Sequence, residues 1–243
     1  MAKPSDFGPG HAYMFAPFDN VHSILIDGQF SRSTMNKGLI ENWVDISARD
    51  ELIIRREEFH DYATLFFGTH TPTQAHHEMR GLEFAIIRYD ADRLFMHDGA
   101  LFSNIALQES GTAGMISSCL KNPENLEEMD WNQINSKRIF PFHPKGRWGQ
   151  AELMIPKHIP KQYIVDVVFK SEGSRSKYFV NFDTNDVNST IDESLFITPK
   201  CKNCGDIDDT RLQNYENAYC PACDHMMYLS GNCLRKWACK SCR

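Results

Sequence analysis

The sequence lacks any long hydrophobic run. No stretch approaches the roughly 20 apolar residues that cross a bilayer, and the first residues, 1–6, contain no apolar core of the kind that a signal peptide needs. Positive charge is also in deficit, with 26 basic against 32 acidic residues and a net charge of −6. A protein that binds duplex nucleic acid by charge alone is usually basic. We therefore expect a cytoplasmic protein without membrane contact, in which any nucleic-acid contact is a local patch.

Cysteine is nearly absent from the first 200 residues, where Cys119 stands alone, yet seven of the eight cysteines lie between 201 and 242. A secreted disulfide protein does not normally confine its cysteines to one tail. Clustered Cys-x-x-Cys pairs are typical of zinc ligands. We therefore predict a catalytic or binding domain over residues 1–197 and a zinc-ribbon module over residues 198–243.

Three Cys-x-x-Cys pairs, each separated from the next by 15 residues, make up most of this tail. Four thiolates from two such pairs form a closed structural zinc site, and a ribbon of this size folds only with its metal. The Cys-x-x-Cys-Gly and Cys-Pro-x-Cys order favours the first two pairs as the ligands of one Zn²⁺. The remaining three cysteines could bind a second Zn²⁺, with His225 as a candidate fourth ligand. The predicted ligands are Cys201, Cys204, Cys220, Cys223, Cys233, Cys239 and Cys242.

The end of the tail combines four cations with one acidic residue, Asp224, and with the rings of Tyr228 and Trp237. Cations interleaved with aromatic residues suit single-stranded nucleic acid, because phosphates meet charge while bases stack. An equally good interpretation is a ribbon that docks on the first domain or binds another protein.

The first domain is dominated by short apolar stretches without regular strand–helix alternation. Strands are expected at residues 13–15, 63–68, 83–89, 95–104, 149–155 and 163–170, and a helix over residues 21–26 that Gly28 ends. This pattern predicts an α+β fold with a mainly antiparallel or mixed sheet and few short helices.

The stretch Gly149–Ile155 is the one on which the functional interpretation depends. Successive side chains of a strand point to opposite faces. Gln150, Glu152 and Met154 would therefore share one face, while the alternate residues, all apolar, share the other and pack on a core. A carboxylate beside an amide suits the floor of a polar cleft.

Several segments in this order resemble the DarT group of ADP-ribosyltransferases over roughly residues 11–172. They are Asn20-Val21 through Gly28, Asn42-Trp43, Arg55-Arg56, His60-Asp61-Tyr62 with the aromatic strand that follows, and Gln150-Ala151-Glu152. The resemblance implies an ADP-ribosyltransferase-like split sheet. It also implies transfer of ADP-ribose from NAD to a base of single-stranded nucleic acid, by a toxin of a toxin–antitoxin or phage-defence system.

The same resemblance implies the roles of the candidate site residues. Glu152 would be the catalytic glutamate, and Arg56, or its neighbour Arg55, the active-site arginine. The residues expected to contact NAD are Tyr13, Arg55, His60, Tyr62, Phe66 and Gln150.

Two departures from the family pattern keep alternatives open. Met14 and Pro17 stand where the family often carries histidines, and residues 102–106 replace a stretch that usually contains a histidine. Single-stranded DNA is the favoured target, with RNA close behind it. The alternative from another class is a catalytically inactive zinc-ribbon protein that binds nucleic acid or acts as an adaptor.

Overall fold

The computed structural model describes residues 2–34, 59–71, 74, 82–103, 119–120, 123–135, 151–182 and 187–196. These ranges contain the sheet, its helices and Glu152. Three of the candidate residues, Arg55, Arg56 and Gln150, lie outside them, as do all seven cysteines of the tail and therefore the predicted zinc-ribbon module.

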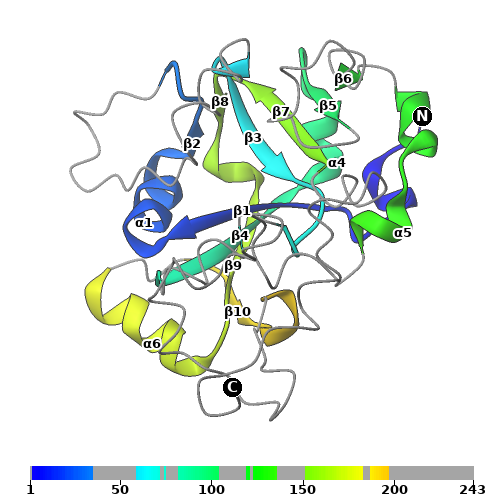
Figure 1. The fold of residues 1–243 in the computed structure, drawn as a ribbon. Helices are drawn as coiled ribbons and strands as arrows, with labels where there is room; N and C mark the ends of the chain where they lie inside the picture. Colours follow the sequence, from blue (N-terminus) through cyan, green and yellow to red (C-terminus); the bar gives the residue numbers. More distant parts are fainter. Residues whose placement is uncertain are drawn as a thin grey trace, which may run out of the picture.

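A mixed sheet forms the centre of the described structure, with strand order β10-β9-β4-β1-β3-β7-β5-β6 (Figure 1). Its strand pairs are antiparallel except β9 and β10, which are parallel. The strands are β1 (His11–Pro17), β3 (Tyr62–Phe66), β4 (Phe84–Asp90), β5 (Leu101–Ser103), β6 (Cys119–Leu120), β7 (Glu152–Pro156), β9 (Ile164–Phe169) and β10 (Ser189–Ile191). A two-stranded sheet pairs β2 (Gln29–Phe30) with β8 (His158–Ile159). The predicted α+β class with a mainly antiparallel sheet is confirmed.

The sheet is nearly divided in two at the contact between β1 and β3. In the described structure these strands share one register pair, Tyr13 with Phe66, whereas β1 and β4 share seven. Figure 1 shows β3 and β7 rising steeply away from β1, while β4 runs alongside it. The described structure therefore has the split sheet that the family resemblance implied.

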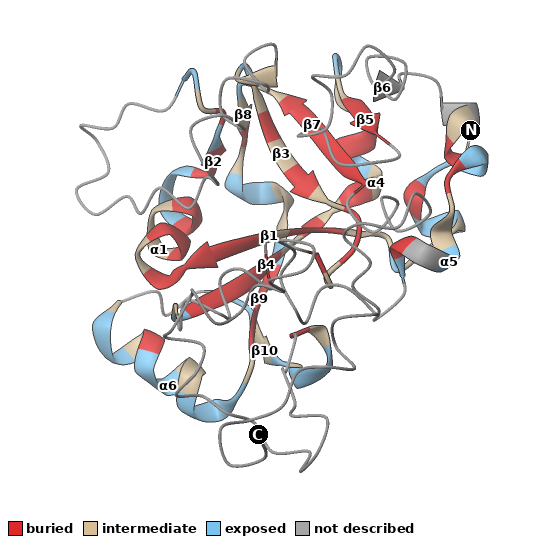
Figure 2. Cartoon of the chain, in the orientation of Figure 1, coloured by how far each residue is buried: buried red, intermediate tan, exposed pale blue. Residues whose placement is uncertain are grey.

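The main hydrophobic core lies on one face of this sheet, where helices cover it. These helices are α1 (Phe18–Asp27), α4 (Ala91–Phe95), α5 (Trp131–Ile134) and α6 (Glu172–Asn181). Ala151, Leu153 and Ile155 are fully buried in this core, as their alternation in the sequence predicted. Figure 2 shows the strands of the sheet largely buried and α6 exposed along much of its outer side.

The expected helix near the N-terminus is present and is longer than predicted. It spans Phe18–Asp27 and ends at Gly28, whose φ of 85° favours glycine. A β-carbon at Gly28 would stand 2.4 Å from the carbonyl oxygen of Ile159, so no larger residue fits there without a shift. Glycine thus both ends the helix and lets β8 approach it.

One expected strand is wrong in its first half. Residues 95–104 were expected to be extended, but Phe95 ends helix α4 and only Leu101–Ser103 form a strand, β5. The helix begins because the carboxylate of Asp90 caps it, accepting the backbone N–H of Arg93 at 3.0 Å. Leu94 and Phe95 are therefore buried by a short helix.

The membrane expectation can also be compared with the structure: none of its described helices has the length and apolarity that a bilayer crossing requires.

Candidate active site

A continuous row of side chains crosses the sheet on the face opposite the main core. Residues directly opposite one another in neighbouring strands project to the same face. Following the register from β9 to β5 gives six such residues, in the order Asp166, Arg88, Tyr13, Phe66, Glu152 and Ser103. The row passes through the joint between β1 and β3, where the two halves of the sheet diverge.

Glu152 is the first residue of β7 and is only 2% exposed. It lies between Phe66 of β3 and Ser103 of β5, and its backbone N–H donates to the Ser103 hydroxyl oxygen at 3.3 Å. Burying a carboxylate costs free energy unless other groups satisfy it. A buried glutamate on the face away from the main core is therefore a feature that sheet stability alone does not require.

The aromatic rings of Tyr13 and Phe66 occupy the joint next to Glu152. Tyr13 is 5% exposed, and burial raises the pKa of its hydroxyl to about 12, so the ring is neutral at physiological pH. Phe66 packs on Phe15 with ring centroids 5.5 Å apart, and His11 approaches Tyr13 edge-on at 6.4 Å. Tyr13 belongs to a second, smaller hydrophobic cluster on this face, and Phe66 packs against that cluster. Of the two rings, Phe66 is the one that is partly exposed and available for stacking.

A buried ion pair stands at the other end of the row. The Arg88 guanidinium donates from Nε to Asp166 Oδ1 at 2.6 Å and from a terminal nitrogen to Asp166 Oδ2. The Thr190 hydroxyl donates to Asp166 Oδ2 at 3.1 Å. The hydrogen bonds to Asp166 raise the pKa of Arg88, although burial opposes this shift. The pair joins β4, β9 and β10 on the face that carries Glu152.

Two other candidate residues lie at the far end of β3. Tyr62 pairs with Pro156 at the end of β7 opposite to Glu152. At about 3.3 Å per residue, it lies roughly 13 Å along the strand from Phe66. It shares the face of Phe66 and packs near Met154. His60 precedes the strand, and its carbonyl oxygen accepts the N–H of Ser33 at 2.9 Å. The structure thus brings Tyr13 and Phe66 to Glu152, and places His60 and Tyr62 further away.

Sequence reasoning missed Arg88, Asp166 and Ser103, which only the strand register connects to Glu152. A signal was present for the first two, because each is a charge surrounded by apolar residues inside a strand, Arg88 in FAIIRYD and Asp166 in IVDVVF. Among the residues that the structure describes, no cluster of histidine, cysteine, aspartate and glutamate forms a metal site.

Comparison with known proteins identifies the family. The family model described as "ssDNA thymidine ADP-ribosyltransferase, DarT" matches residues 13–195, which is most of the chain. No curated protein matches the sequence.

Solved structures with a similar fold include DarT proteins of Thermus sp. 2.9 and Thermosipho africanus. The DarT of Thermus sp. 2.9 in complex with ADP-ribosylated ssDNA superposes with a TM-score of 0.63 at 17% identity, over 81% of this chain and 99% of that one. The same Thermus protein in complex with NAD+ gives a TM-score of 0.58 at 15% identity, over 78% of this chain and 98% of that one. Thermosipho africanus DarTG in complex with ADP-ribose superposes with a TM-score of 0.61 at 17% identity, over 78% of this chain. This chain spans only 51%, about half, of the length of that protein.

Proposed function

The chain belongs to the DarT family of ssDNA thymidine ADP-ribosyltransferases, and from this premise we propose that it transfers ADP-ribose from NAD+ to a base of single-stranded DNA, with Glu152 as the catalytic carboxylate. In this reaction the bond between nicotinamide and C1′ of the ribose breaks. A nitrogen of the target base forms the new bond to C1′, and the base loses a proton. The products are the ADP-ribosylated base, nicotinamide and a proton.

The observation that carries this proposal is the position of Glu152. It is a buried carboxylate in a row of aromatic and polar side chains, on the sheet face opposite the main core. Loss of nicotinamide leaves positive charge on the ribose. A fixed carboxylate stabilises that charge, holds a ribose hydroxyl and accepts the proton of the attacking base. Hydrogen bonding from the Glu152 backbone N–H to Ser103 ties the start of β7 to β5, so the backbone that carries the carboxylate is held in place before substrate binds.

Tyr13 and Phe66 are the residues that we propose to hold the NAD+ rings, since both lie in the row beside Glu152. Phe66, which is partly exposed, offers a flat apolar surface to the nicotinamide or to the target base, and the neutral, buried ring of Tyr13 would support it from behind. We assign Arg56, or Arg55, to the phosphates of NAD+, and Gln150 to the sugar or the base. His60 and Tyr62, at the far end of β3, would contact a more distant part of NAD+ or of the nucleic acid.

The biological role that we propose is that of a toxin in a toxin–antitoxin or phage-defence system, restrained by an antitoxin or chaperone protein. We favour single-stranded DNA as the target because the family model is described by that substrate. RNA is the second candidate, because residues 102–106 depart from the family pattern.

We further propose that the cysteines of residues 198–243 form a zinc ribbon with one or two structural Zn²⁺ ions, separate from the catalytic domain of residues 1–197. The spacing of its Cys-x-x-Cys pairs supports this. Metal analysis of the purified protein would find one or two zinc ions per chain, and replacing Cys201 and Cys204 with serine would remove at least one. A chain that binds no zinc would contradict the module.

The decisive experiment incubates the purified protein with labelled NAD+ and, separately, single-stranded DNA, duplex DNA, RNA and a protein extract. Glu152→Gln is the control, since the amide keeps the shape of the side chain and removes its charge. Label on single-stranded DNA that disappears in a folded Glu152→Gln protein would support the proposal. Label on RNA would change the substrate. Transfer that survives the substitution would remove Glu152 from the mechanism, and the absence of any transfer would favour an inactive binding protein.

A further inference from the structure

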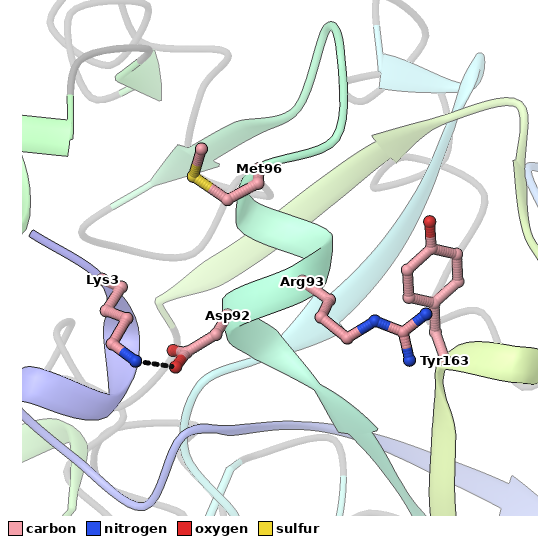
Figure 3. A pocket seen from close by; sticks show the side chains of 5 residues that line it. All are labelled: Lys3, Asp92, Arg93, Met96 and Tyr163. Carbon is pink, nitrogen blue, oxygen red and sulfur yellow. Dashed lines mark ion pairs between the residues drawn. The ribbon is translucent and has the colours of Figure 1, made fainter. Parts of the chain in front are cut away.

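A pocket of about 480 Å³ lies beside helix α4, lined by Lys3, Asp92, Arg93, Met96 and Tyr163 (Figure 3). Helix α4 packs Leu94 and Phe95 into the main core, so this pocket is on the side of the sheet away from the Glu152 row. Its volume falls within the range of about 300 to 1,000 Å³ that is usual for small-ligand sites. The proposed mechanism uses none of its five residues.

The pocket contains a cation placed over an aromatic ring. The Arg93 guanidinium carbon stands 4.8 Å from the centre of the Tyr163 ring, and one of its nitrogens donates to the carbonyl oxygen of Gln162 at 3.3 Å. Figure 3 shows the two side chains facing each other from α4 and from the segment before β9. These contacts hold the guanidinium in place on the ring and leave a planar surface that carries positive charge.

The charge inside the pocket favours an anion. Lys3 pairs with Asp92, the one carboxylate among the lining residues, at 3.2 Å, and Asp92 also accepts the backbone N–H of Ser5 at 2.9 Å. With Asp92 compensated in this way, Arg93 remains as the excess charge. Lys161, an exposed residue outside the lining, precedes Tyr163 by two positions in the sequence.

An exposed apolar side chain completes the lining. Met96 is 61% exposed, so its side chain is accessible to a ligand in the pocket. Thioethers make favourable contacts with aromatic systems. A ligand that combines a flat ring with a phosphate would contact Met96 and Tyr163 through the ring and Arg93 and Lys3 through the phosphate.

The pocket lies close to one end of the Glu152 row along the chain. Arg88 belongs to the row, and Arg93 of the pocket follows it by five residues, across the end of β4 and the first turn of α4. The same strand end is where β9 begins, directly after Tyr163. The Arg88–Asp166 end of the row and the pocket thus lie near the same end of strands β4 and β9, on opposite sides of the sheet. A single strand that extends from one to the other would pass over this end of the sheet.

We propose that this pocket binds a nucleotide of the single-stranded nucleic acid that lies several positions away from the modified base, so that it anchors the strand at a second point. The proposal rests on the proposed function, because it assumes a nucleic-acid substrate at Glu152. Aromatic stacking combined with a few cations is the usual way in which proteins bind single strands without reading their sequence. The site would favour longer substrates over shorter ones.

The test measures binding of single-stranded oligonucleotides by fluorescence anisotropy, in Glu152→Gln protein so that no transfer occurs. Oligonucleotides of roughly 4 and roughly 16 nucleotides span the usual site sizes of single-strand-binding domains. The pocket variants are Arg93→Ala and Tyr163→Ala. Arg175→Ala is the matched control, since Arg175 also lies over a ring, that of Phe179, at 5.9 Å on the exposed helix α6.

We expect each pocket variant to weaken binding of the long oligonucleotide about fivefold to tenfold, the usual effect of losing one stacking contact, with no change for the short one. Loss of Arg93 should also reduce the slope of log affinity against log salt by about one. Arg175→Ala should change neither. Thermal unfolding curves establish that each variant is folded, and Arg93→Lys, which retains the charge, should restore the salt slope.

The pocket proposal is overturned if the variants bind the long oligonucleotide as the Arg175→Ala control does, or if they weaken the short and long oligonucleotides equally. It is also overturned if Glu152→Gln protein binds both lengths with the same affinity. Transfer of labelled ADP-ribose to the short oligonucleotide by the unmodified protein tests the proposed function separately. Transfer without any length effect would therefore refute the second binding point alone, and no transfer to nucleic acid would refute both.

Discussion

Removing the negative charge of Asp166 should destabilise the protein more than removing any surface charge. Asp166 is buried and accepts hydrogen bonds from the Arg88 Nε at 2.6 Å, from a second guanidinium nitrogen and from the Thr190 hydroxyl at 3.1 Å. Asp166→Asn preserves the volume of the side chain. It leaves the guanidinium without its hydrogen-bonded carboxylate partner in a site where the Arg88 side chain is only 21% exposed.

The expected loss is about 2–3 kcal/mol in the free energy of unfolding. Breaking a fully buried ion pair from one side typically costs about 3–5 kcal/mol, and the partial exposure of Arg88 reduces this through solvent screening. In a chain of this size the melting temperature should fall by roughly 5–10 °C. The double variant Arg88→Gln with Asp166→Asn should recover much of the loss, because neither charge is then left alone.

The measurement is urea unfolding of the four members of this double-mutant cycle. The Lys177–Glu83 ion pair is the matched control, since both side chains are about half exposed although their charged atoms lie 2.5 Å apart. Its coupling should be about 0–1 kcal/mol. A coupling between Arg88 and Asp166 no larger than that of this surface pair would refute the reasoning, because burial would then add nothing to the interaction.

Further expectations concern the site and the fold. Glu152→Gln should lower the rate of transfer by about 100-fold or more without unfolding the protein. Ser103→Ala removes the hydroxyl that accepts the Glu152 N–H, and it should lower kcat about tenfold with little change in KM for NAD+. Ser103→Thr should restore kcat. An unchanged kcat in Ser103→Ala would mean that Ser103 does not position Glu152. Gly28→Ala should cost about 2 kcal/mol or more, seen as a lower urea midpoint, because the new carbon would meet the carbonyl of Ile159 at 2.4 Å and φ is 85°. Burial raises the pKa of Tyr13 from 10 to about 12, so the free energy of unfolding should fall as the pH rises between these values. Over the same pH range, the urea midpoint of Tyr13→Phe should fall less steeply than that of the unmodified protein.

The orientation of Glu152 could be predicted from the sequence because strand alternation is a local property. Ala151, Leu153 and Ile155 are all apolar, so the face that they share had to be buried, and it is. The strand was expected from residue 149; residues 149 and 150 lie outside the described residues, and β7 as described begins at Glu152. Its start depends on pairing with β3 and β5, which the sequence of this segment alone does not specify.

The partners of Glu152 could not be predicted because strand register is set by distant parts of the chain. Ser103 and Asp166 are separated in sequence by 63 positions, yet they belong to one row across the sheet. A slip of one residue in any pairing would turn its side chain to the opposite face. The misassigned first half of residues 95–104 has a different cause, since the cap that starts α4 comes from Asp90, before the apolar stretch that suggested a strand.

The division of the sheet explains why stability and the proposed chemistry are separated in this fold. The main core lies on one face and includes residues of α1, α4, α5 and α6, so it holds both halves of the sheet together without the joint between β1 and β3. That joint shares one register pair in the described structure, which leaves the strands free to diverge around Tyr13, Phe66 and Glu152. The face of the row has a smaller hydrophobic cluster of its own, which includes Tyr13 and Phe15 but not Glu152. Glu152 can therefore be a buried carboxylate there, which a well-packed core would exclude.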